Sequence, residues 1–80
     1  MPYIKIADRQ RLEGSKALPK TAGELNYVIT KIVRKYIGSE YNYQSLNEVI
    51  GVLECAKLEL YRRVVARYED IKRQENGDVF

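Results

Sequence analysis

The sequence contains no histidine, no tryptophan and only one cysteine among its 80 residues. A single chain therefore lacks the residues for the usual zinc sites, for Ser-His-Asp or Cys-His catalysis, for a redox CxxC motif and for an internal disulfide. It also has no apolar run of about 18 residues that would span a bilayer. These absences exclude most enzyme classes, and we expect a cytoplasmic, non-enzymatic protein with no cofactor and no bound metal.

Positive charge exceeds negative charge only slightly. There are 14 Lys and Arg against 11 Asp and Glu, a net charge of +3. The excess falls in the first twenty residues, which is a weaker basic bias than nucleic-acid coat proteins have. The basic residues of that segment are Lys5, Arg9, Arg11, Lys16 and Lys20.

A chain of this length forms one small domain, 1–80, and its pattern predicts a mainly α fold. Tyr3 to Ile6 alternates like a short strand, so we expect a strand or extended arm at the N-terminus, followed by one helical turn and a loop. Thr21 and Glu24 are spaced to cap a helix start, and Gly38 is a ready stop. We therefore expect four segments: an arm and loop over 1–20, a first helix over 21–38, a long helix over 43–74, and a turn and tail over 75–80.

The long helix predicts self-association. Ser45 and Glu48 have capping-box spacing, and no proline and no glycine beyond Gly51 interrupts the chain before Gly77. At 1.5 Å per residue the helix is about 45 Å long, more than the preceding helix can cover. We therefore expect a helical hairpin that assembles as a homo-oligomer, with extended segments at the two termini that pair with each other.

Two apolar stripes follow from a rotation of about 100° per residue along the long helix. The first, which we expect to be core, contains Leu46, Val49, Ile50, Leu53, Leu60, Tyr61, Val64, Tyr68 and Ile71. The second contains the small or apolar residues Gly51, Cys55, Leu58, Val65 and Ala66. The second stripe is a surface either for the N-terminal arm or for another copy of the chain.

Lys57 is the one charge in the middle of the first stripe. It either extends its ammonium group to solvent or awaits an anion as a partly desolvated cation. Arg62 and Arg67 follow within the next turns, and aromatic rings beside such cations suit a phosphate and a stacked base. The candidate ligand-binding residues are Lys57, Arg62, Arg67, Tyr27, Tyr43 and Tyr61, and the candidate interface residues are Gly51, Cys55, Leu58 and Val65.

Three segments of the sequence resemble a family of short uncharacterised proteins encoded by tailed phages, prophages and related bacterial elements. They are Gly23–Thr30, Tyr43–Arg63 and Glu75–Val79. The likeness covers most of the chain. It implies a genomic setting in which compact non-enzymatic proteins often sequester host components, but it implies no activity, cofactor or catalytic residue.

Three function hypotheses remain. The leading one is a sponge that holds an anionic, nucleotide-type signalling molecule in a pocket between subunits. The alternative is a small module that docks on a host or phage protein through the turn with Tyr41 and Tyr43 and through the outer face of the first helix. That face is expected to carry Tyr27, Lys31 and Arg34. The third is nucleic-acid binding through the basic N-terminal segment, which the lack of a one-signed basic face on the long helix disfavours.

Overall fold

The secondary structure is helical. A computed structural model describes residues 2–14 and 17–80, and no residue in those ranges lies in a strand. The chain divides into two compact units, Met1–Tyr41 and Asn42–Phe80. The prediction of a mainly helical chain with a long C-terminal helix is confirmed, whereas neither of the expected terminal segments is a strand.

The first helix, α1, spans Ile6–Glu13, where the sequence pattern predicted an arm, a single helical turn and a loop. Lys5 is extended, and the carbonyl group of Lys5 accepts the first helical hydrogen bond, from the N–H of Arg9 (3.0 Å). The strand prediction was wrong because four alternating residues are too few to outweigh the helix-forming segment after them. The alanine, arginines, glutamine, leucine and glutamate of α1 all have high intrinsic helix propensity.

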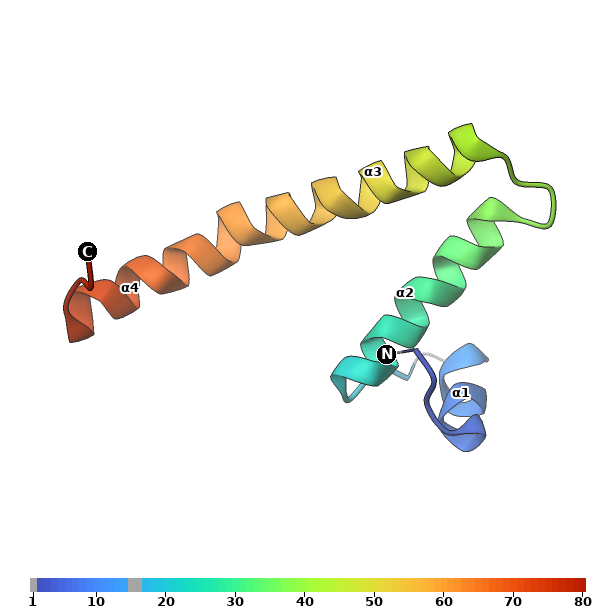
Figure 1. The fold of residues 1–80 in the computed structure, drawn as a ribbon. Helices are drawn as coiled ribbons and strands as arrows, with labels where there is room; N and C mark the ends of the chain where they lie inside the picture. The colour runs from blue at the N-terminus through green and yellow to red at the C-terminus, as the bar shows by residue number, and fades with distance from the viewer. Residues whose placement is uncertain (1, 15–16) are drawn as a thin grey trace. The chain divides into compact units, whose positions relative to one another are not determined.

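The second helix, α2, spans Ala22–Ile37 and packs against α1 within the first unit (Figure 1). The Thr21 hydroxyl accepts a hydrogen bond from the N–H of Glu24 (3.1 Å), as the spacing predicts. The helix ends at Gly38, which has a φ of 72° and donates its N–H to the carbonyl of Arg34 (3.0 Å). Both helix ends therefore satisfy backbone groups that helical hydrogen bonds leave unpaired.

The long helix runs continuously from Tyr43 to Asn76 (Figure 1). It consists of α3 (Tyr43–Leu60), a π-helical turn η1 (Tyr61–Val65) and α4 (Ala66–Asn76). The sequence predicted a start near Tyr43 correctly, but assigned the capping box to the wrong residues. Asn42 is the cap: its side chain accepts from the N–H of Ser45 (2.9 Å), and the Ser45 hydroxyl accepts from the N–H of Asn42 (3.1 Å).

The π-helical turn changes which residues share a face. In η1 the N–H of Ala66 bonds to the carbonyl of Tyr61, five residues back instead of four. Such a turn contains one more residue than an α-helical turn. Every side chain beyond it is therefore rotated back by about 100° relative to a continuous α-helix. The uniform rotation used to draw the two stripes from sequence fails at this point.

Two glycines provide a matched test of the helix boundaries. At Gly38, φ is 72° and ψ is −163°, a conformation that almost only glycine adopts. A Cβ at either Gly38 or Gly51 meets no atom within 4 Å, so packing does not distinguish them. We expect Gly38→Ala to destabilise the fold by about 1–3 kcal/mol and Gly51→Ala, inside α3, to stabilise it by about 0.5–1 kcal/mol.

Chemical denaturation of the two variants at one protein concentration measures both changes. Equal effects of the two substitutions would contradict the assigned end of α2.

Candidate functional site

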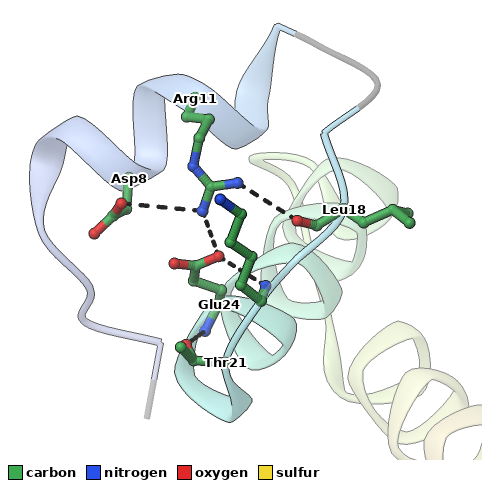
Figure 2. A network of polar contacts seen from close by, with 6 residues as sticks. Asp8, Arg11, Leu18, Thr21 and Glu24 are labelled. Atoms are coloured by element: carbon green, nitrogen blue, oxygen red, sulfur yellow. Dashed lines mark hydrogen bonds and ion pairs between the residues drawn. The ribbon is translucent and has the colours of Figure 1, made fainter.

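Glu24 is the centre of a polar network that joins α1, the following loop and α2 (Figure 2). The Glu24 carboxylate accepts hydrogen bonds from the Arg11 guanidinium and from the backbone N–H of Lys20 (2.9 Å). Arg11 also donates to the carbonyl of Leu18 (3.4 Å) and lies 3.9 Å from the Asp8 carboxylate. The Lys20 N–H first, and then Arg11, lower the pKa of Glu24 below its ordinary value.

Tyr27 is buried against α1, not on an outer face of α2 as predicted. Its hydroxyl donates to the Glu13 carboxylate, which also pairs with the Lys31 ammonium (3.1 Å), and Arg9 lies over its ring (5.8 Å to the centroid). The hydrogen bond to Glu13 raises the pKa of Tyr27, and the same bond, with Lys31, lowers that of Glu13. Tyr27 is therefore a core residue and is not available to stack on a ligand.

Two of the basic N-terminal residues make contacts inside the first unit. Arg9 donates to the carbonyl of Ile4 (2.8 Å), and Arg11 belongs to the Glu24 network. Lys5 and Lys20 are exposed, and Lys16 lies outside the described residues. The segment is therefore partly committed to holding α1 in place.

The apolar residues of the long helix are exposed, although the sequence predicted that the first stripe is core. Of the nine predicted core residues only Val49 is buried, and Leu53 and Leu46 are 38% and 39% exposed. A helix has no interior of its own, so these side chains stay in water unless another element covers them. This surface is the largest candidate site in the second unit.

The π-helical turn moves Val65 from the second stripe to the side of Leu53. Val65 is 36% exposed, the least exposed of the long helix's exposed large apolar residues. We define the long-helix face as the apolar residues that share this side: Leu46, Val49, Ile50, Leu53, Leu60, Tyr61, Val64, Val65 and Tyr68. Of the four predicted interface residues, Gly51, Cys55 and Leu58 are exposed and lie on a different side.

The three candidate cations do not form one cluster. Lys57 is 68% exposed and pairs with Glu54 (3.0 Å), so it is not the desolvated cation that one prediction required. Arg62 pairs with Glu59 (3.0 Å), whereas Arg67 is exposed and has no ion pair within the described ranges. The π-helical turn brings Arg62 and Arg67 to the same side, but Lys57 projects from a different side.

The two remaining candidate tyrosines are exposed. The Tyr61 hydroxyl donates to the Glu69 carboxylate (2.8 Å), which raises the pKa of Tyr61. These residues are eight apart, which is an offset of about 80° in an uninterrupted α-helix, and η1 reduces that offset to about 20°. Tyr43 is 84% exposed in the first turn of α3. Tyr41 is exposed as well.

A shallow hollow beside α4 contains charges of both signs. It is lined by Tyr61, Glu69, Arg73 and Phe80, among others, and the Arg73 guanidinium lies 3.5 Å from Asp70 and 3.9 Å from Asp78. Its acidic residues make it a poor anion site. Within residues 2–14 and 17–80 no group of three metal-ligating side chains occurs, and no helix is long and apolar enough to cross a membrane.

Comparison with known families gives one assignment. The family model described as a domain of unknown function, DUF6899, matches residues 1–79. The chain belongs to this family. No curated protein and no solved structure matches it. Family membership therefore supports a shared fold over almost the whole chain and assigns no activity to any residue.

Sequence patterns do not reveal the Glu24 network because its contacts are not local. The spacing predicted Glu24 only as half of a capping box with Thr21, but its carboxylate receives the N–H of the preceding Lys20 and the side chain of Arg11, thirteen positions away. The π-helical turn was missed because no residue type in 61–65 marks it. A helix over the whole of 6–13 would have placed Arg11 near α2, so the length of α1 was the missing step.

The Glu24 network predicts acid sensitivity. The pKa of Glu24 is lowered in the folded chain from its ordinary value of about 4.5. The ionised carboxylate therefore stabilises the folded chain fully above that value, and this stabilisation disappears as the pH falls through the lower pKa of the folded state. We expect Glu24→Gln to lower the melting temperature at pH 7. We also expect the melting temperature of this variant to fall less than that of the wild type between pH 7 and pH 3. Circular dichroism melts measure both effects.

Glu40→Gln is the matched control, because it removes the same charge from an exposed position in the same unit. The Glu40 variant should keep the wild-type pH dependence. A Glu24 variant that also keeps it would show that this network does not stabilise the first unit.

Proposed function

We propose that this protein is a non-enzymatic binding protein that assembles with itself through the long-helix face. The observation that supports this function is the exposure of that face: eight of its nine residues are exposed large apolar side chains. Monomeric soluble proteins rarely expose a contiguous apolar surface of this extent. A second copy of the chain has the same apolar face, of the same length, so two copies can cover each other's faces.

The free energy of burying the long-helix face favours an assembly over a single chain. Covering one Leu, Val or Ile side chain contributes about 1.5–3 kcal/mol. Two or three such residues match the whole stability of a small domain, which is about 5 kcal/mol or slightly more. Within the described residues, the buried apolar core consists of Leu12, Tyr27 and Val49. The chain alone therefore buries too little apolar surface for a stable small domain.

Two single substitutions distinguish the long-helix face from the second stripe. We expect Leu53→Lys to weaken self-association about a hundredfold or more, because a symmetric interface loses the side chain twice, about 3–6 kcal/mol. Leu58→Lys adds the same charge to another side of α3 and should leave association unchanged. Light scattering coupled to size exclusion over a range of concentrations measures both.

Weaker association of Leu58→Lys, with unchanged association of Leu53→Lys, would place the interface on Gly51, Cys55 and Leu58, the surface that the sequence predicted. A wild-type chain that stays at 9.3 kDa at high concentration would refute self-assembly altogether.

Sequestration of an anionic, nucleotide-type ligand is the second candidate function. What supports it is Arg67, a guanidinium with no ion pair among the described residues, with Arg62 on the same side. Guanidinium groups bind phosphate by paired hydrogen bonds. The resemblance to phage-encoded proteins supports it further, since sequestering a host signal, as an anti-defence protein in the host cytoplasm, suits that setting.

Calorimetry with a panel of cyclic and linear nucleotides tests sequestration. We expect at least one nucleotide to bind the wild-type protein. The Arg67→Ala variant should bind it with an affinity at least tenfold lower, because a charged hydrogen bond contributes about 1.5–3 kcal/mol. Lys57→Ala should bind normally, since Lys57 projects from another side. No heat with any member of the panel at high protein concentration would exclude this function while leaving self-assembly intact.

A further inference from the structure

The charges of the long helix are divided between its two halves. The α3 half, Tyr43–Leu60, carries three glutamates and one lysine, a net charge of −2. The half made of η1 and α4, from Tyr61 to Asn76, carries five basic and three acidic residues, a net charge of +2. The sign changes between Glu59 and Arg62. Each long helix is therefore a charge dipole centred close to its own midpoint.

This division distinguishes the two ways of pairing identical helices. A parallel pair in register places acidic halves together and basic halves together, which is repulsive. An antiparallel pair places each acidic half beside the partner's basic half. The backbone dipoles act in the same direction, because antiparallel helices set the positive end of each beside the negative end of the other.

The positions of the individual charges agree with an axis at the sign change. If a two-fold axis passes midway between Leu60 and Tyr61, residue i of one helix is level with residue 121 − i of the other. The three acidic residues of α3 are then level with three arginines of the second copy. The level pairs are Glu48 with Arg73, Glu54 with Arg67, and Glu59 with Arg62.

From this charge pattern we propose that two copies of the chain pair antiparallel along their long-helix faces, with the two-fold axis beside the π-helical turn. The inference rests on the proposed self-assembly and adds its geometry. Leu53 of each copy is then level with Tyr68 of the other, and Lys57 with Val64. The charged side chains lie on sides of the helix other than the long-helix face, so they favour the antiparallel orientation through the field along the helix axis and not through ion pairs between the two copies.

Spin labels near the two ends of the helix measure the orientation. Gln44 and Gln74 are exposed, so we place one cysteine at a time there, Gln44→Cys or Gln74→Cys, with Cys55→Ser to leave a single labelling site. At 1.5 Å per residue the antiparallel pair separates the two labels by about 50 Å for position 44 and about 40 Å for position 74. A parallel pair separates them by roughly the width of two helices, about 10–20 Å, at both positions.

The outcomes distinguish this inference from the proposed function. Long distances at both positions support the antiparallel pair, and their difference locates the axis. Short distances at both positions, with a dimer in light scattering, overturn the orientation but keep self-assembly. No dipolar signal, with a 9.3 kDa mass, overturns both and leaves the face to a different protein. Circular dichroism of each labelled variant confirms that it remains helical.

Discussion

An α-helix has no interior, so it buries an apolar face only against something else. That constraint governs the second unit, whose described residues form one helix followed by a short tail. Its hydrogen bonds are satisfied locally, by Asn42 at one end and by Gly77 at the other. The apolar side chains of the long-helix face cannot be covered by such local contacts. Capping determines where the helix begins and ends, and covering its face requires another molecule or another part of the chain.

The first unit is held together partly by hydrogen bonds and ion pairs of charged side chains. Its apolar core is small, and two carboxylates add to it by accepting several hydrogen bonds each. Glu24 receives Arg11 and the Lys20 N–H, while Glu13 receives Tyr27 and Lys31. Each carboxylate connects α1 to residues of α2 or to the loop between them. A short helix with few apolar residues is thereby held in place by polar contacts that a hydrophobic pattern does not reveal.

The sequence predicted the elements that local signals define. Thr21, Gly38 and Gly77 lie at helix ends, and their side chains or lack of a Cβ act within one turn. It did not predict contacts that depend on residues distant in sequence, such as Arg11 with Glu24. Nor did it predict η1, because a π-helical turn depends on the packing and strain of a whole helix and has no residue code. The burial of Tyr27 depends on α1, which the sequence predicted only as a single helical turn.

The π-helical turn also affects how the family can vary in length. Loss of any one residue between 61 and 65 would let that segment relax to ordinary α-helix without disturbing either neighbouring helix. The backbone would stay continuous, and α4 would keep its orientation relative to α3, because removing one residue turns the helix back by the same 100° as the π-helical turn does. A deletion there is thus conformationally mild and preserves the long-helix face. Loss of one residue within α3, with η1 kept, would instead turn α4 by about 100° relative to the start of α3 and divide that face into two sides.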